Sequence, residues 1–200
     1  MSETLEQLFG SRSRSRVLRF FILNPERDFL TIDVATRNMI KSQDARKECT
    51  ALTKIKFLKE KKRKGKKIYQ LNTQFTYYPE LKGLFVKANA YPQCHALSKL
   101  KSIGNVQLAL VSGVFLNYGR SKIDLFIVAD NVSRVRLNNL VKEIEAEIGK
   151  EVRYMILTTE EMKYRMDMMD RFLMEFLTGP TDEVINRMPK LENFVNDFKK

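Results

Sequence analysis

The sequence is poor in the residue types that form disulfides or bind structural metals. Its 200 residues include two cysteines, one histidine and no tryptophan. Cys49, Cys94 and His95 are too few for a disulfide framework, and they do not by themselves complete a four-ligand zinc site. We therefore expect a fold that holds no structural metal and no cofactor.

Long apolar runs are also missing. The longest, Val106–Phe115, is far shorter than the roughly 20 residues that a membrane-spanning helix needs. The first residues include Glu3 and lack the apolar centre of a signal peptide. We expect a cytoplasmic protein without a membrane partner, and the 44% of hydrophobic side chains indicates a folded chain.

Acidic residues are scarce in the first part of the chain. Residues 1–88 contain 20 Lys and Arg but 9 Asp and Glu, whereas residues 89–200 contain 16 and 15. The net charge of +12 therefore lies almost entirely in the first part. Clustered cations gain free energy when they release counterions from a phosphate backbone. The asymmetry thus indicates a polyanion-binding module followed by a near-neutral one.

The spacing of apolar residues in the first part predicts three helices, over residues 17–23, 32–37 and 43–55. The Asn24-Pro25 step ends the first helix, because the residue before proline avoids the helical conformation. Thr31 and Ser42 are the expected N-caps of the second and third helices, and Asn38 in the left-handed conformation is expected to end the second.

The third of these helices is amphipathic. Ala45, Cys49 and Leu52 share its apolar face. The opposite face carries polar and basic side chains, which are Gln43, Arg46, Lys47, Thr50 and Lys54.

Two strands, over residues 57–61 and 68–71, come next and predict a hairpin. Their connection, residues 62–67, reads Lys-Arg-Lys-Gly-Lys-Lys and turns at Gly65, so the hairpin has a cationic tip. Residues 77–87 predict a connector helix that starts near Pro79. Its apolar side packs on the first domain or on a second copy of the chain.

The order of helix, short helix, basic helix and basic hairpin resembles a winged helix-turn-helix over Leu8 to Leu84. In that family the third helix enters the major groove of DNA, and the hairpin, or wing, rests on phosphate or on the minor groove. The resemblance implies double-stranded DNA as the partner. It implies groove contacts from Ser42, Gln43, Arg46, Lys47 and Thr50. It implies wing contacts from Lys62, Arg63, Lys64, Lys66 and Lys67.

A charge run alone is also typical of a solvated turn. Here the run follows a helix with a basic outer face, and the two features together favour DNA binding.

The second part alternates strands and helices. The expected strands cover residues 106–111, 123–128 and 152–157, and the first two form a hairpin. The expected helices are one capped by Ser133 and ended by Gly149, one that opens at Thr158 or Thr159, and one over Met168 to Leu177.

Residues 100–177 resemble the minimal nucleotidyltransferase domain, and Ser121-Lys122-Ile123-Asp124-Leu125 is the stretch that carries the resemblance. In active members two aspartates one residue apart, with a third acid on a neighbouring strand, hold two metal ions, while a Gly-Ser pair grips the triphosphate. In this chain Lys122 stands at the first aspartate's position, the strand over 152–157 has no carboxylate, and the Gly-Ser position reads Ser112-Gly113. An ammonium beside a single carboxylate repels magnesium. We therefore expect a degenerate site, Lys122 and Asp124, with no catalytic and no metal-binding residue.

These patterns predict an α+β protein with a winged helix-turn-helix domain over residues 1–88 and a small α/β nucleotidyltransferase-like domain over residues 89–200. The function that fits them is a DNA-binding transcriptional regulator and not an enzyme, with the second domain used for assembly or sensing. Two alternatives stay open. One is an active nucleotidyltransferase that holds its substrate with the winged module, and the other is a winged module that binds RNA or only protein. A homodimer and an effector also stay open.

Overall fold

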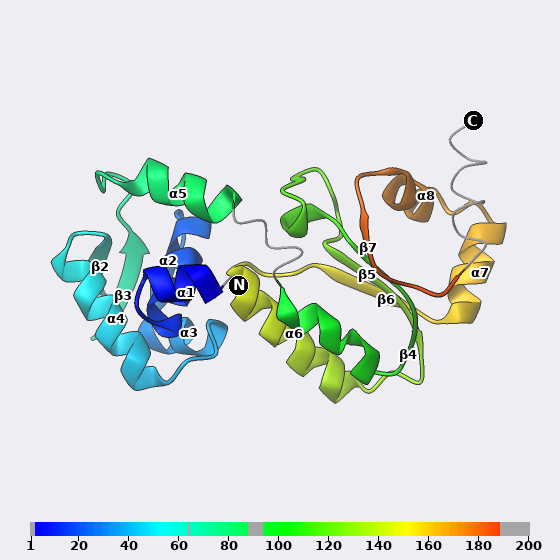
Figure 1. Ribbon diagram of the computed structural model, residues 1–200, viewed down its shortest axis with the longest axis horizontal. Helices are drawn as coiled ribbons and strands as arrows, with labels where there is room; N and C mark the ends of the chain where they lie inside the picture. Colours follow the sequence, from blue (N-terminus) through cyan, green and yellow to red (C-terminus); the bar gives the residue numbers. More distant parts are fainter. Residues whose placement is uncertain (1–2, 64, 88–93, 189–200) are drawn as a thin grey trace. The chain divides into compact units, whose positions relative to one another are not determined.

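The computed structural model describes residues 3–63, 65–87 and 94–188 and shows a mixed α+β fold with two small sheets (Figure 1). The chain forms two compact units, residues 1–89 with 142–151 and residues 90–141 with 152–200. In the described part of the chain, no helix combines the length and the apolar character needed to cross a bilayer.

The first unit consists largely of helices around a three-stranded antiparallel sheet of order β1-β3-β2. Before residue 89 its elements are α1 (Glu3–Leu8), α2 (Arg12–Leu23), β1 (Asp28–Leu30), α3 (Thr31–Arg37), α4 (Ser42–Lys54), β2 (Leu58–Arg63), β3 (Lys66–Leu71) and α5 (Tyr78–Lys87). The three predicted helices and the hairpin are therefore present, and α1 and β1 are additional.

The caps of these helices differ from the prediction. The N-cap of α3 is Leu30, and the carboxylate of Asp33 accepts a hydrogen bond from its N–H at 3.0 Å. The N-cap of α4 is Lys41, one residue before the predicted cap. At the end of α3 it is Met39 that takes the left-handed conformation, with φ +49°, while Asn38 stays right-handed.

The core of the first unit is built from the apolar stripe of each helix and the inner side of the sheet. Phe20 and Phe21 of α2 contact Phe29 of β1, with ring centroids 4.5 and 5.9 Å apart. Cys49 of α4 and Tyr69 of β3 belong to the same cluster, and both are at most 1% exposed. Burial raises the pKa of the Cys49 thiol to about 12, so it is a packing side chain and not a reactive thiolate at neutral pH.

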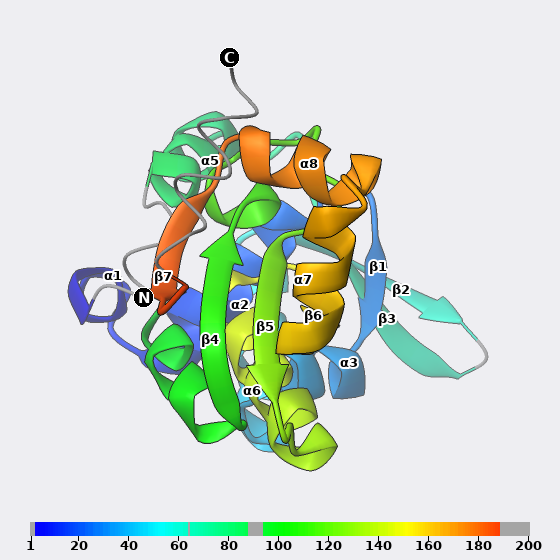
Figure 2. The ribbon, with the colours of Figure 1, turned by 90° about the vertical axis from the view of Figure 1, so that its right-hand side faces the viewer.

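The rest of the chain contains a four-stranded sheet of order β6-β5-β4-β7 (Figure 2). The elements are the 3₁₀ helices η1 (His95–Ser102) and η2 (Gly113–Phe115), β4 (Asn105–Val111), β5 (Leu125–Asp130), α6 (Arg134–Ile148), β6 (Tyr154–Leu157), α7 (Thr159–Asp167), α8 (Arg171–Thr178) and β7 (Asp182–Asn186). Strands β4 and β5 form the predicted antiparallel hairpin, β6 pairs with β5 in parallel, and β7, which was not predicted, pairs with β4.

Several boundaries in this sheet layer differ from the sequence pattern. Strand β5 begins at Leu125 and not at Ile123, and strand β6 begins at Tyr154 and not at Val152. Helix α8 begins at Arg171, because the carboxylate of Asp170 caps it and accepts from the N–H of Leu173 at 2.9 Å. The side chains of α7 and α8 pack on one face of the sheet, where Met162 and Leu173 meet Leu108, Phe126 and Val128.

Candidate nucleic-acid interface and the Asp124 site

The outer face of α4 gathers one of the two predicted sets of contact residues. All five members, Ser42, Gln43, Arg46, Lys47 and Thr50, are exposed. On the inner face Ala45, Cys49 and Leu52 are at most 4% exposed. The helical spacing therefore placed both faces correctly, and the polar set forms one continuous surface, which we call the α4 face.

Helix α4 and the turn before it are tied to α2 by two arginines. Arg14 Nε lies 2.9 Å from Glu48 Oε2, and that glutamate is 5% exposed. Arg16 Nη1 donates to the carbonyl oxygen of Asn38, in the turn between α3 and α4, at 2.8 Å. Burial, and after it the nearby charge of Arg12, lower the pKa of Arg16. These charged contacts, in which Glu48 and Arg16 are buried, hold α4 against α2.

The β2–β3 hairpin holds the second predicted set, and Lys62, Arg63, Lys66 and Lys67 are all exposed. Lys64 lies outside the described residues. The strands extend further than predicted, so the connection is shorter, and Gly65 occupies its left-handed position with φ +73°.

This longer pairing has an electrostatic consequence. Lys62 stands directly opposite Lys67, and Arg63 stands directly opposite Lys66. Like charges directly opposite each other in an antiparallel pair destabilise it. The end of the hairpin is therefore an arrangement that an approaching polyanion would stabilise.

Glu60 partly offsets this repulsion. Its carboxylate oxygens lie 2.9 and 3.1 Å from Lys67 Nζ. The hydrogen bond from Lys67 to Glu60 raises the pKa of the lysine, which stays charged at neutral pH.

A groove of about 560 Å³ runs between the α4 face and the hairpin. Its lining residues are Leu30, Thr31, Ile32, Arg46, Thr50, Lys66, Lys67 and Tyr69. The groove brings together two predicted residues of α4 and two of β3 in a lining that contains no carboxylate. It also includes Thr31, Ile32 and Tyr69, which the sequence analysis did not select as contacts.

Tyr69 is the least obvious of these three. Its side chain is 1% exposed, and burial, followed by the charge of Glu60, raises its pKa. A side-chain hydrogen bond links it to Thr31 at the start of α3. The alternation of apolar residues in β3 predicts that Tyr69 is buried, but only the pairing of β3 with β1 brings it to Thr31.

In the second unit, Lys122 and Asp124 do not form one site. Lys122 Nζ lies 3.1 Å from Glu175 Oε2 on α8, and both side chains are more than 60% exposed. Asp124 is fully buried and paired with Arg153. Both residues precede β5, so the alternation of a strand does not place them on one face.

The Asp124 carboxylate accepts four hydrogen bonds, each 2.9 Å long. The donors are the backbone N–H of Val114, the backbone N–H of Arg153, and Arg153 Nε and Nη2. Burial alone raises the pKa of Asp124, but the hydrogen bonds from Arg153 and Val114 outweigh it and hold the pKa below the usual value of 3.8. The carboxylate is therefore ionised at neutral pH, with its oxygens already occupied.

Gly113 packs directly against the Asp124 carboxylate. It has φ +48°, and a Cβ at this position would overlap the Asp124 carboxylate. The Ser112-Gly113 turn thus packs on Asp124 and makes no cradle for a ligand. Among residues 3–63, 65–87 and 94–188, no three Asp, Glu, His or Cys side chains are grouped to hold a metal ion.

Comparison of the chain with protein-family models, with curated proteins and with solved structures finds no match.

We expect Asp124→Asn to lower the free energy of unfolding by about 3 kcal/mol. The substitution removes the negative charge that pairs with Arg153, and it places an amide NH2 group against N–H donors that now lack an acceptor. Urea unfolding at pH 7 measures this, with Asp167→Asn, an exposed site on α7, as the control of equal charge change. The native pKa of Asp124 is lowered, so its stabilisation is present at neutral pH and is lost as pH falls below 3.8. The variant and the intact protein should converge there, and equal stabilities at pH 7 would contradict the assignment.

Proposed function

We propose that this protein is a DNA-binding transcriptional regulator, with a winged helix-turn-helix in its first unit and a nucleotidyltransferase-like fold without transferase activity in its second. The order of α2, α3, α4 and the β2–β3 hairpin supports the first part. In this proposal the α4 face reads the major groove of duplex DNA, and the hairpin is the wing.

The observation that carries the proposal is the pair of like-charge contacts at the end of the hairpin, next to a groove without carboxylates. Lysines and arginines at such a tip bind phosphates without reading sequence. The α4 face offers Gln43 and Arg46, whose side chains can donate to base edges in the major groove. One surface thus provides both kinds of contact that a sequence-specific DNA-binding protein needs.

The proposal that the second unit is not an enzyme rests on Asp124 and Lys122. Every oxygen of the Asp124 carboxylate is engaged by Arg153 or Val114, and Lys122 already faces Glu175. Phosphoryl transfer depends on groups that offset charge on the moving phosphate, and metal ions are held for this by free carboxylates. We assign this unit to assembly or to sensing, and pairing of two copies on a two-fold DNA site would fit the first of these roles.

The first test is the salt dependence of affinity for random-sequence duplex DNA, measured by fluorescence anisotropy. The logarithm of the association constant should fall by about 0.9 for each phosphate contact per logarithmic unit of salt. A Lys62→Ala, Arg63→Ala and Lys66→Ala triple variant should have a shallower slope and weaker binding to all sequences, with unchanged or higher stability because repulsion is relieved.

The matched control removes three exposed cations of the second unit, Lys163, Arg171 and Arg187. If this control weakens binding as much as the hairpin variant does, or if affinity is independent of salt, the proposed interface is wrong. Duplex RNA of the same sequence, measured in parallel, separates DNA binding from RNA binding.

The second test concerns base recognition by the α4 face. Gln43→Ala and Arg46→Ala should each cost about 1–3 kcal/mol at the duplex that the intact protein selects from a random pool, and should relax its base preference. The hairpin variant should bind more weakly with an unchanged preference. Selection of the same sequence by all variants would show that α4 is not the reading helix.

The third test uses Glu60, the acid that pairs with Lys67. Glu60→Gln should strengthen DNA binding several-fold and steepen the salt slope by about 0.9, because it frees one more ammonium for phosphate. Glu80→Gln on α5 removes the same charge from an exposed position of the first unit and is the control. An equal gain from both variants would mean that only net charge matters and not the Glu60 contact.

A further inference from the structure

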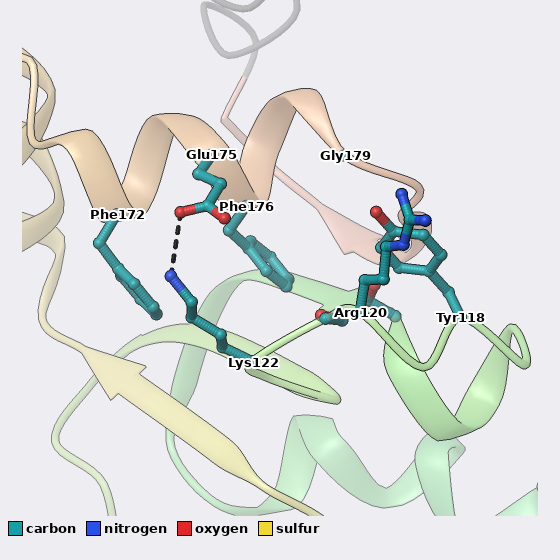
Figure 3. A pocket seen from close by; sticks show the side chains of 9 residues that line it. Tyr118, Arg120, Lys122, Phe172, Glu175, Phe176 and Gly179 are labelled. Atoms are coloured by element: carbon teal, nitrogen blue, oxygen red, sulfur yellow. Dashed lines mark hydrogen bonds and ion pairs between the residues drawn. The ribbon is translucent and has the colours of Figure 1, made fainter.

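A small pocket of the second unit lies between the loop that precedes β5 and helix α8 (Figure 3). Its volume is about 60 Å³ and it is partly open to solvent, so it can hold the small polar group of a ligand whose remainder lies at the opening. Tyr118, Arg120 and Lys122 reach it from the loop, and Phe172, Glu175 and Phe176 reach it from α8. Asp124 is buried beneath the loop and does not line it.

The charges around this pocket do not cancel. Lys122 is paired with Glu175, which is the one carboxylate of the lining. Arg120 is an exposed residue that also lines the pocket, and no ion pair or hydrogen bond joins its guanidinium to a described residue. The lining thus carries one uncompensated positive charge, on a planar group that binds carboxylate or phosphate through two parallel hydrogen bonds.

Two of the three hydroxyl groups in the lining already donate a hydrogen bond within the protein. Ser112 Oγ donates to the carbonyl of Pro180 at 2.6 Å, and Ser121 Oγ donates to the carbonyl of Ile123 at 2.5 Å. Their protons are therefore not available to a ligand. The Tyr118 hydroxyl and the Arg120 guanidinium remain as donors to a ligand, beside the Lys122 ammonium, which already donates to Glu175.

The α8 side of the pocket is aromatic. Phe176 is 8% exposed and is held against Phe126 of β5, with ring centroids 5.3 Å apart. The Lys122 Nζ lies over the ring of Phe172, 6.0 Å from the ring centroid. An apolar part of a ligand would find a rigid surface here, next to the charged donors.

We propose that this pocket binds a small organic anion, which places a carboxylate or phosphate group on Arg120 and Tyr118 and an apolar body against Phe172 and Phe176. The site needs no metal ion, because the countercharge is the guanidinium itself. It is too small to enclose a nucleoside triphosphate. The proposal does not depend on DNA binding.

The test is a titration of the full chain followed by two-dimensional ¹H–¹⁵N NMR. The probes are acetate, benzoate, inorganic phosphate and phenyl phosphate, with sodium chloride at equal ionic strength as the reference. Saturable shifts are expected at residues 112–122 and 172–179, with benzoate tighter than acetate, or phenyl phosphate tighter than phosphate. Binding of acetate and benzoate would identify a carboxylate as the preferred group of the ligand, and binding of phosphate and phenyl phosphate would identify a phosphate. Shifts at residues 58–71 report anions on the basic hairpin and are counted separately.

Arg120→Gln should weaken binding about tenfold or more, as loss of a charge-assisted hydrogen bond implies. Arg134→Gln removes an equal charge from an exposed position of the same unit and should leave the affinity unchanged. Lys122→Gln should have a smaller effect than Arg120→Gln, because Glu175 already pairs with the lysine.

Three outcomes would overturn the proposal: equal loss in the Arg120 and Arg134 variants, shifts that sodium chloride reproduces, or an aromatic anion that binds no tighter than its bare counterpart. Binding of a nucleoside triphosphate only with magnesium, with shifts centred on Asp124 and Arg153, would point to a nucleotide site and would also reject it.

Discussion

The buried Asp124 carboxylate is the contact on which the arrangement of the second unit depends. Four donors, from the turn after β4 and from the segment that enters β6, converge on its two oxygens. A buried charge is tolerated only when its hydrogen-bonding capacity is satisfied, and here it is. The same bonds explain why Gly113 must lack a side chain and why the carboxylate has no oxygen left for a ligand. The same four hydrogen bonds stabilise this part of the unit and engage both oxygens of the carboxylate.

On the β2–β3 hairpin of the first unit, in contrast, the charged side chains are exposed and stand opposite like charges. Its core binds the near ends of β2 and β3 through Leu58, Tyr69 and Leu71, each at most 2% exposed. Beyond them the strands continue as a cationic ribbon whose opposed side chains repel each other. The apolar ends therefore stabilise a hairpin whose outer part is unfavourable by itself. Such a ribbon keeps its positive charge exposed to solvent, and Glu60 pairs with Lys67 at its base.

Arg153 and Arg120 show how the environment of an arginine sets its role. Arg153 makes both side-chain and backbone contacts with the carboxylate, and its side-chain hydrogen bonds to Asp124 raise the pKa of the guanidinium. Arg120 lines an open pocket in which its donors are uncommitted. The first is a structural cation, and the second is the one with free energy to gain from a ligand.

The sequence by itself determined the features that depend on local periodicity and composition. The spacing of Ala45, Cys49 and Leu52 is enough to separate the two faces of α4, because a helix places such positions on one side. The basic run around Gly65 specified a cationic hairpin, since that glycine takes the left-handed conformation its turn requires. The tertiary structure decided what depends on partners far along the chain. Strand β1 has three residues and β7 begins with two acids, so neither shows a strand pattern, and they exist through pairing with β3 and β4.

The same limit applies to caps and sites. Thr31 was expected to cap α3, but the pairing of Leu30 with Ile68 keeps Leu30 extended and makes it the cap. The groove beside α4 and the choice of Arg153 for Asp124 also join segments that are distant in sequence. A local sequence pattern does not specify which distant groups come into contact. Those contacts depend on the packing of the whole unit and on the free-energy cost of a buried polar group without a partner.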